Sequence, residues 1–393
     1  MSTENRWLLP DGIDELLPER ASAVEALRRR LLDICGHWGY RYVIPPLVEF
    51  TDSLLVGLGA DLDVLTCQFA DRMSGRMLGV RADITPQVAR IDAHSLGEPG
   101  VTRLCYAGST LHSTPLSVTG GRSPIQLGAE VFGCESIDAD IEVISLLLTL
   151  LQELGEGRQI TFDLGHVGIF EAVFKSLSLP SDEAVAIFDA MQRKSAPDLD
   201  LVLSRLPAEP RGLIRQMFGL HGSVAVMSQA RELLADMPSA VNALDELQSV
   251  VDTIARRFDG VDIYIDLTEL RGFRYHTGLV FAAYLEGAGV AVAKGGRYDN
   301  VGRVYGRARP ATGFACDLKA LAGAFMPAVS EVGAVAAPID ADPELDSAIA
   351  QLRASGRQVI AMLDQSVDPQ CTEVLVNRGQ GWVVQSLADS ESS

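Results

Sequence analysis

The sequence predicts an α+β fold, in which an antiparallel sheet flanked by helices is interrupted by one helical insertion. Between residues 64 and 135, short strand-like segments alternate with glycine turns, and strand patterns return after residue 260. Residues 170–257, in between, have helical periodicity throughout. Strands separated by a long run of helices are typical of α+β proteins, whereas regular alternation would indicate a parallel βαβ fold.

The first strong helix is predicted over residues 21–38. Apolar side chains recur there from Val24 to Trp38 at intervals of three and four residues, and charged residues face away from them. Gly39 ends the helix, and residues 40–44 then have the composition of a strand that stops at two prolines. A helix that leads into such a strand is common, so this pair alone identifies no function.

The remaining elements of the first domain follow from the same patterns. We expect further strands at 75–80, 102–108, 125–133, 161–164, 261–267, 279–285 and 290–293. A strongly apolar helix is expected over residues 139–153. The sequence therefore predicts a first domain over residues 1–327, with the helical insertion at 170–257 inside it.

The composition changes after about Pro327, where alanine, valine and aspartate become dominant. The expected elements are a strand (332–336), a helix (343–354), a strand (357–363) and a strand pair (373–385). Residues 331–393 contain 10 acidic and 3 basic residues, a net charge of −7. We therefore predict a small, acidic α/β domain over residues 331–393.

The charge balance argues against nucleic-acid binding. The 393 residues include 33 Lys+Arg and 52 Asp+Glu, so the formal net charge is −19. Such a chain repels polyanions, because phosphate contacts need clustered lysines and arginines. The six cysteines form no CxxC pair, so neither a disulfide framework nor a zinc site is expected. We predict no metal and no cofactor.

A membrane location is not expected either. The longest apolar run, Val143–Leu151, is far shorter than the ~20 residues that a bilayer requires. The first residues lack the basic segment and apolar stretch of a signal peptide. We therefore expect a cytoplasmic protein.

Two short segments hold polar residues at positions suited to ligand binding. Asp83 precedes the predicted helix that starts near Thr85, where its carboxylate either binds an ammonium group or caps the helix. Gln126 and Glu130 share one face of a predicted strand, because residues i and i+4 of a strand point to the same side. Gly128 lies between them and leaves a gap, so the pair suits a ligand with an amine or imidazole N–H. The alternative is a solvated polar face.

A third segment combines arginine, tyrosine and histidine with glycines. It runs from Leu270 to Gly278 and is followed by Lys294–Asn300, which includes two consecutive glycines and Tyr298. Such glycines either allow a ligand to approach the backbone closely or form plain turns.

Taken together and in this order, the three segments resemble the catalytic domain of histidyl-tRNA synthetase, which has a class II aminoacyl-tRNA synthetase fold. The resemblance begins at Leu9, covers about four-fifths of the chain and ends near Ala315. Residues 270–278 resemble the histidine-specific signature of that family. In that family the segment matching residues 21–50 forms a dimer interface, so the resemblance implies self-association through these residues.

The resemblance implies a largely retained histidine pocket. The positions of this sequence that match the histidine-binding residues of that family are Asp83, Gln126, Glu130, Arg271, Tyr275 and Tyr298. Asp83 is one methylene shorter than the glutamate expected there, and His276 replaces the second tyrosine of the signature. The depth of the pocket and its ring contacts are therefore open.

The same resemblance implies that the ATP site is lost. His112 stands where the family has the arginine that binds the α-phosphate, and Thr114 stands at the place of a glutamate. Ala320 takes the place of the second nucleotide-binding arginine. Because arginines that stabilise phosphoryl transition states can contribute ~10³–10⁵ in rate, we expect no useful adenylate formation and assign no catalytic residue.

A synthetase-like chain with a histidine pocket and no ATP site resembles the HisZ family, the regulatory subunits of short-form ATP phosphoribosyltransferase. This resemblance implies a non-catalytic subunit that supports the short catalytic subunit, HisG, in the first step of histidine biosynthesis. Feedback by free histidine is implied, either at this pocket or at an interface between subunits. A stand-alone amino-acid-binding scaffold and, less favoured, an active histidyl-tRNA synthetase are the alternatives.

Overall fold

The computed structural model describes residues 7–55, 60–115, 120–153, 159–177, 179–269, 275–287, 289–324, 333–379 and 381–390. The chain divides into two compact units, Met1–Met326 and Pro327–Ser393. The larger unit contains both the polar segments predicted to bind a ligand and the helical insertion.

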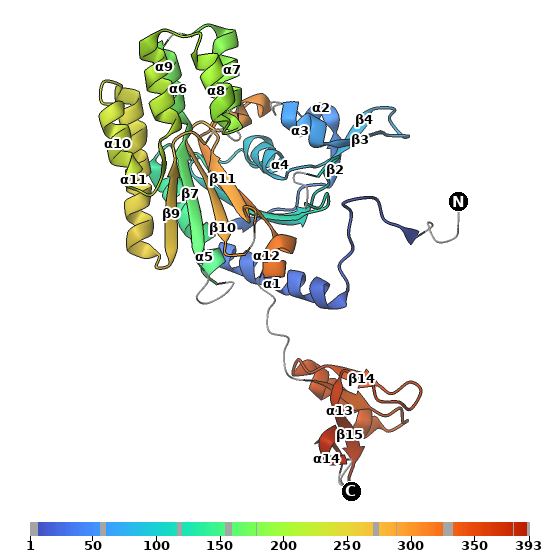
Figure 1. The fold of residues 1–393 in the computed structure, drawn as a ribbon. Coiled ribbons are helices and arrows are strands. Elements are labelled where there is room, and N and C mark those ends of the chain that lie inside the picture. The colour runs from blue at the N-terminus through green and yellow to red at the C-terminus, as the bar shows by residue number, and fades with distance from the viewer. Residues whose placement is uncertain are drawn as a thin grey trace. The chain divides into compact units, whose positions relative to one another are not determined.

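The larger unit is built on a nine-stranded sheet with the order β1-β5-β6-β12-β11-β10-β7-β9-β8. Figure 1 shows β11, β10, β7 and β9 of this sheet side by side. In that order the strands are Arg41–Tyr42, Thr102–Ser109, Ile125–Phe132, Ala311–Asp317, Ala293–Arg297, Leu279–Leu285, Ile160–His166, Val261–Asp266 and His221–Gly222. Six of the neighbouring pairs are antiparallel, but β1 with β5 and β7 with β9 are parallel. The α+β class and the mainly antiparallel sheet are confirmed, and these two parallel pairs are the exceptions.

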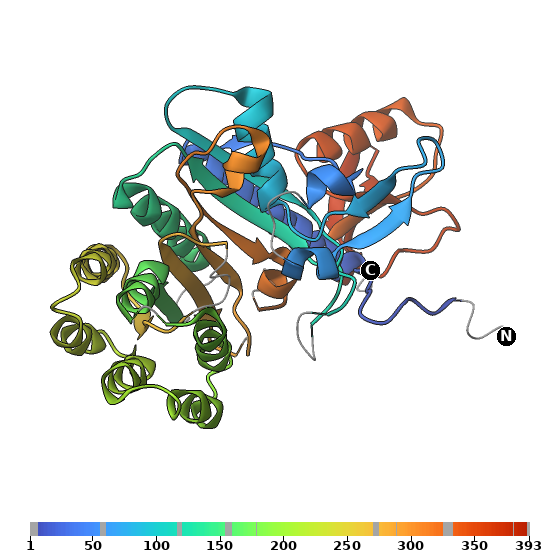
Figure 2. The ribbon, with the colours of Figure 1, turned by 90° about the horizontal axis from the view of Figure 1, so that it is seen from above.

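The helical insertion explains one of the parallel pairs. Neighbouring parallel strands need a crossover connection, and the chain between β7 and β9 provides it. Its helices are α6 (Val167–Leu177), α7 (Ser181–Gln192), α8 (Ala196–Leu203), α9 (Ala208–Phe218), α10 (Val226–Leu233) and α11 (Pro238–Arg257). Figure 2 shows several of them nearly end-on. The expectation that residues 170–257 are helical throughout is wrong, because the two residues of β8 pair with β9.

One face of the nine-stranded sheet carries the main hydrophobic core. Helices α1 (Pro18–His37), α5 (Ile137–Gln152), α11 and α12 (Leu318–Ala324) pack there. From β6, Leu127, Ala129 and Val131 enter this core, so the intervening residues of the strand lie on the opposite face. On that opposite face a second cluster includes Leu104 and Tyr106 of β5.

Short elements surround this opposite face. They are α4 (Thr85–Arg90), the π-helical segment Ile91–Leu96 and the 3₁₀ segment Val301–Tyr305. A three-stranded antiparallel sheet with the order β2 (Val48–Phe50), β4 (Met77–Val80) and β3 (Cys67–Ala70) is accompanied by α2 (Thr51–Leu54) and α3 (Ala60–Leu65).

The glycines at 295 and 296 lie inside β11 rather than in a turn, and β11 begins at Ala293 instead of ending there. A Cβ atom on Gly296 would lie 2.5 Å from the carbonyl oxygen of Leu279, and one on Gly295 would collide with the backbone of Gly313. Both glycines therefore allow close packing between strands. The sequence analysis interpreted this glycine pair as a turn or as a ligand contact.

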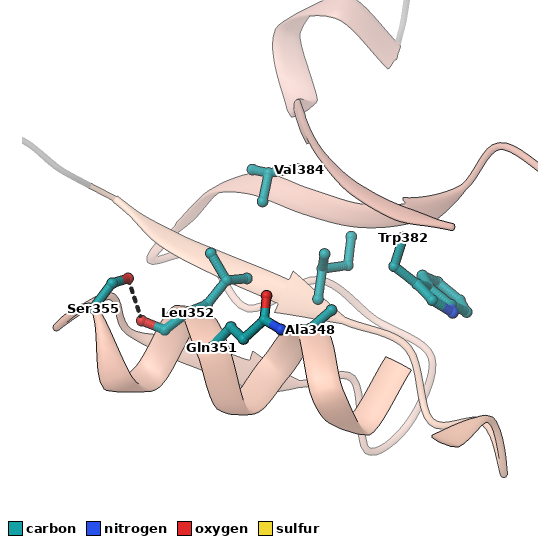
Figure 3. Close-up of a pocket in the computed structure, with 7 residues that line it drawn as sticks. Ala348, Gln351, Leu352, Ser355, Trp382 and Val384 are labelled. Atoms are coloured by element: carbon teal, nitrogen blue, oxygen red, sulfur yellow. Dashed lines mark hydrogen bonds between the residues drawn. The ribbon is translucent and has the colours of Figure 1, made fainter. Parts of the chain in front are cut away.

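The smaller unit has a four-stranded sheet with the order β14-β13-β15-β16. Its elements are β13 (Ala334–Ala337), α13 (Pro343–Ala354), β14 (Val359–Ala361), β15 (Cys371–Asn377), β16 (Trp382–Ser386) and α14 (Leu387–Ser390). A shallow hollow of about 280 Å³ lies between α13 and the sheet, with Gln351 and Trp382 at its sides (Figure 3). Its lining has no titratable side chain, so it offers no site for acid–base chemistry.

Truncating Phe162 to alanine is expected to destabilise the larger unit by about 3–5 kcal/mol, because a cavity would remain in a close-packed core. Phe162 is fully buried on β7 and stacks on Phe281, with ring centroids 5.6 Å apart. Urea unfolding measures the loss. Val185→Ala on α7, where the side chain is 51% exposed, is the control and is expected to change stability by less than ~0.5 kcal/mol. Equal effects of the two variants would contradict the placement of this core.

Candidate functional site

Glu130 is the most deeply buried member of the predicted histidine pocket. Only 1% of its surface is exposed, and it lies on the face of β6 that is opposite the main core. The Tyr298 hydroxyl donates to Oε2 at 2.6 Å, and the Tyr106 hydroxyl donates to Oε1 at 3.1 Å. Burial away from water raises the pKa of the Glu130 carboxyl to about 8. The group is therefore mostly a neutral acid at pH 7.

Tyr106 was missed by sequence reasoning, and it occupies the gap that Gly128 was expected to leave for a ligand. A Cβ atom on residue 128 would lie 2.5 Å from the carbonyl oxygen of Phe314 and closer still to the Tyr106 hydroxyl. That hydroxyl also lies 3.0 Å from Thr85 Oγ1. Gly128 thus makes room for a tyrosine of the neighbouring strand, and the expected open gap is corrected.

Asp83 and Gln126 meet beside this buried cluster. Gln126 Nε2 donates to Asp83 Oδ1 at 2.8 Å, and Gln126 Oε1 accepts the backbone N–H of Ile84 at 2.8 Å. Asp83 Oδ1 also accepts the N–H of Thr85 at 3.0 Å, at the first turn of α4. Asp83 therefore does bind the start of the helix, and Oδ2 makes no hydrogen bond to the described residues.

Tyr275 stacks on Tyr298, with ring centroids 5.1 Å apart and the planes inclined by 26°. Its hydroxyl is buried and has no hydrogen-bond partner among the described residues. Burial, reinforced by the charges of Asp83 and Glu130, raises the pKa of the Tyr275 hydroxyl well above 10. An uncharged donor therefore remains available next to the Asp83–Glu130 cluster.

Five of the six predicted pocket residues thus form one connected neighbourhood on β6, before α4 and around β11. The sixth, Arg271, lies outside the described residues, as do its neighbours 270–274. Tyr106 lies two residues after buried Leu104 on β5, so the two side chains share one face of the strand. This spacing of two residues is the sequence signal that could have revealed Tyr106.

His112, at the place of the first ATP-binding arginine, is engaged with the backbone. Because a carbonyl oxygen only accepts, the 3.0 Å contact of His112 Nε2 with the Ala82 oxygen places the hydrogen on Nε2. His112 Nδ1 is buried and has no partner in the described parts of the chain. Ala82 directly precedes Asp83, so His112 braces the loop that carries this carboxylate. Thr114 is exposed.

The cationic side chains on this side of the sheet also bind protein groups. Arg81 donates to the carbonyl oxygens of Pro45 and Ser109, each at 2.8 Å. Arg122 donates to the carbonyl oxygen of His112 at 2.9 Å and to that of Asp11 at 3.1 Å.

The charged side chains at the end of β12 also bind protein groups. Lys319 Nζ forms an ion pair with Asp14 at 2.7 Å. Asp317 Oδ1 accepts the backbone N–H of Lys319 at 3.0 Å, and burial raises the pKa of this carboxyl. Ala320, at the place of the second arginine, is a half-buried methyl group on α12. None of these groups offers a free guanidinium to a phosphate.

The described residues hold no group of three or more His, Cys, Asp or Glu side chains that could bind a metal ion. In the same residues, none of the helices combines the length and the apolar character needed to cross a bilayer.

Comparison with known proteins agrees with this arrangement. Residues 12–321 match the family model of histidyl-tRNA synthetase, and residues 332–385 match the C-terminal domain of the ATP phosphoribosyltransferase subunit HisZ. The ATP phosphoribosyltransferase regulatory subunit of Marinobacter nauticus is 47% identical over 394 residues, which is 99% of this chain and 100% of the relative. The chain belongs to the ATP phosphoribosyltransferase regulatory subunit family. The resemblance inferred from the sequence is thereby confirmed, and the predicted regulatory, non-catalytic role follows from membership of this family.

Solved structures share the fold. A Bacillus halodurans protein, described as an ATP phosphoribosyltransferase regulatory subunit/histidyl-tRNA synthetase, has a TM-score of 0.81 and 23% identity, covering 93% of this chain and 95% of its own. The HisG:HisZ complex of Thermotoga maritima ATP phosphoribosyl transferase contains a chain with a TM-score of 0.58 and 21% identity. That likeness covers 75% of this chain and 97% of the other. The synthetase-like class II fold is confirmed.

Proposed function

We propose that this chain is the regulatory subunit that assembles with a short-form catalytic subunit, HisG, to perform the first step of histidine biosynthesis. It does no chemistry of its own. Support comes from membership of the regulatory subunit family over 99% of the chain and from a structural relative found in a HisG:HisZ complex.

The observation that carries this proposal is that cationic side chains around the positions matching the synthetase ATP site are bonded to protein groups. Arg81, Arg122 and Lys319 all bind backbone carbonyls or a carboxylate, and the two expected arginine places hold His112 and Ala320. Recruiting one of these cations to a phosphate would break existing hydrogen bonds, and a bond to a charged group is worth ~1.5–3 kcal/mol. Adenylate formation is therefore disfavoured, whereas the predicted histidine pocket keeps most of the side chains that the resemblance implies.

Co-purification tests the assembly. The full chain and a tagged short phosphoribosyltransferase from the same host are co-expressed, and the tagged protein is captured. We expect recovery of both chains in a fixed ratio. Recovery of the catalytic subunit alone would contradict the proposal and favour the stand-alone scaffold. Incubation of the chain with histidine, ATP and tRNA tests the remaining alternative, because an active synthetase would charge the tRNA.

We further propose that free histidine is the effector and that Asp83, Gln126, Glu130, Arg271, Tyr275 and Tyr298 form its site. A carboxylate oxygen of Asp83 and the hydroxyl of Tyr275 are the unoccupied polar atoms of the described cluster, so they suit the ammonium group and a ring nitrogen of such a ligand. The competing site for histidine is an interface between subunits.

Asp83→Asn is expected to weaken histidine binding at least tenfold, because the variant keeps the side-chain shape and the acceptor for Thr85 but loses the charge that would face an ammonium group. Isothermal calorimetry with the full chain and free histidine measures the change. Asp33→Asn, on the exposed side of α1, is the matched control and is expected to bind as wild type does. Equal affinities of all three proteins would place the effector elsewhere.

We also propose self-association through residues 21–50. The short edge strand β1 is followed by exposed apolar side chains, with Ile44 77% and Leu47 49% exposed. Ile44→Asp is expected to convert a dimer to a monomer, as light scattering after gel filtration would show, because a charge would be buried without a partner. Ile339→Asp, 65% exposed on the smaller unit, is the control. An unchanged mass for Ile44→Asp would contradict this interface.

A further inference from the structure

Thr277 joins the two segments that carry the stacked tyrosines of the candidate pocket. Its hydroxyl donates to Asp299 Oδ2 at 2.7 Å and accepts the backbone N–H of Asp299 at 3.1 Å. The N–H of Thr277 also donates to the carbonyl oxygen of Arg297 at 2.8 Å. Tyr275 lies two residues before Thr277, and Tyr298 directly precedes Asp299. These three hydrogen bonds therefore tie the backbone next to one ring to the backbone next to the other.

Asp299 is itself held by the interior of the larger unit. Its Oδ1 accepts the N–H of Ala311 on β12 at 3.1 Å and lies 3.4 Å from Nη1 of Arg297. Arg297 is 8% exposed, and its Nε donates to Oδ2 of Asp140 at 3.0 Å. Asp140 is fully buried on α5, a helix of the main core. The Asp299 carboxylate is therefore held in place independently of Thr277.

The two hydrogen bonds of the Thr277 hydroxyl require this functional group. A carboxylate oxygen only accepts and a backbone N–H only donates, so the hydroxyl acts as donor and acceptor at once. Thr277 is half-buried and lies outside β10, which begins at Leu279. Neither strand pairing nor complete burial of its methyl group therefore explains a threonine here. Its bond to the Asp299 carboxylate belongs to the stronger class of hydrogen bonds.

The Tyr275 hydroxyl is the group whose position depends on this attachment. It is buried near Asp83 and Glu130 and makes no hydrogen bond within the described parts of the chain. The Tyr275 ring stacks on Tyr298, with 5.1 Å between the centroids. Because aromatic pairs occur over centroid distances of about 4.5–7 Å, stacking alone does not fix the hydroxyl. The backbone that Thr277 holds, two residues away, supplies the missing constraint.

We propose that Thr277 is a positioning residue of the histidine pocket, which acts through Tyr275 by holding the backbone of this segment against Asp299. The inference rests on the proposed function of the pocket and adds a residue that does not touch the ligand. Without the bond to Asp299, Tyr275 keeps its stack, but its hydroxyl no longer lies at one defined place beside Asp83. Binding of histidine must then order this segment, which lowers the affinity.

Three substitutions at residue 277 separate the hydroxyl from the rest of the side chain. Thr277→Val keeps the branched shape and removes the hydroxyl, and Thr277→Ala removes it with less volume, so a misfit of valine is recognised. Thr277→Ser keeps the hydroxyl and removes only the methyl group. Thr149→Val is the matched control, because the half-buried Thr149 hydroxyl donates to the Ser145 carbonyl oxygen at 2.8 Å within α5. Isothermal calorimetry with free histidine is performed on each full-length protein.

Thr277→Val and Thr277→Ala are expected to bind histidine roughly tenfold more weakly than wild type, or weaker still. Thr277→Ser should stay within about threefold of wild type, and Thr149→Val should be unchanged. The Asp299 amide loses its acceptor in the valine and alanine variants, so its hydrogen exchange should be roughly tenfold faster there. Wild-type affinity in both of these variants would overturn the inference, as would an equal loss in Thr277→Ser.

A second readout distinguishes positioning from a general loss of structure. Tyr275→Phe keeps the ring and removes the hydroxyl through which Thr277 acts, and it is titrated at correspondingly higher histidine concentrations. In this background, Thr277→Val is expected to weaken binding by less than about threefold further, because residues that act through one another are not additive. An equal further loss in both backgrounds would contradict action through Tyr275. Absence of histidine binding by the wild type would refute the pocket as well, whereas wild-type binding with unaffected variants would refute the positioning role alone.

Discussion

Replacing Glu130 with glutamine is expected to remove a large part of the pH dependence of stability between pH 5 and pH 8. The carboxyl is 1% exposed, and burial raises its pKa in the folded chain to about 8. Its ordinary value is about 4.3, so between these values the folded state holds a proton that the unfolded state has released. The stabilising contribution is therefore complete below about pH 4.3 and is lost as the pH rises through about 8.

The expected size follows from this shift. In the wild type, the free energy of unfolding should fall by about 1.4 kcal/mol for each pH unit in the window, and by roughly 5 kcal/mol in all. Glutamine has nearly the same shape and cannot ionise, so Glu130→Gln should be the more stable protein at pH 9. Urea unfolding at one-unit steps from pH 5 to pH 9, with Glu142→Gln as the control, measures the difference. Parallel curves for wild type and Glu130→Gln would contradict a buried neutral acid at this site.

Gly128→Ala is expected to cost about 3 kcal/mol or more, because overpacking a close-packed interior forces neighbouring groups apart. The added Cβ would lie 2.5 Å from the Phe314 carbonyl oxygen and closer to the Tyr106 hydroxyl, and the Phe314 oxygen belongs to the paired strand β12. The same change would push Tyr106 away from Glu130, so histidine binding should fall together with stability.

A glycine in open surroundings provides the control for that substitution. Gly36 lies in α1, and a Cβ atom there would meet nothing within 4 Å. Gly36→Ala is therefore expected to stabilise the chain by ~0.5–1 kcal/mol, through the better helix propensity of alanine. Thermal and urea unfolding of both variants give the comparison. A Gly128→Ala protein as stable as Gly36→Ala would show that Tyr106 does not fill this space.

The predicted strand over 125–133 located the site because the period of two residues in a strand is a local property. Leu127, Ala129 and Val131 alternate with Gln126, Gly128 and Glu130, and the structure places the two sets on opposite faces. Which side chain fills the space over Gly128 depends on the register of β5 against β6, and that register pairs Tyr106 with Gly128. No local pattern contains this information, so the gap was wrongly predicted to be open.

Other differences have the same non-local origin. The two-residue strand β8 takes its pairing from β9, about 40 residues later, and its own composition does not distinguish it from a loop. The glycines of β11 were ambiguous because close strand packing and a turn both favour a residue without Cβ. The role of Asp83 at the start of α4 was foreseen as an alternative, and the structure shows that one oxygen binds the helix while the other makes no hydrogen bond to the residues that the structure describes.

The most direct test of the regulatory role is the turnover of a short-form ATP phosphoribosyltransferase from the same host, measured from purified components. The catalytic subunit is assayed alone, with this chain, and with this chain plus increasing concentrations of free histidine. We predict that turnover depends on the added chain and falls as histidine rises. Turnover that is the same with and without the chain would contradict its assignment as a required regulatory subunit.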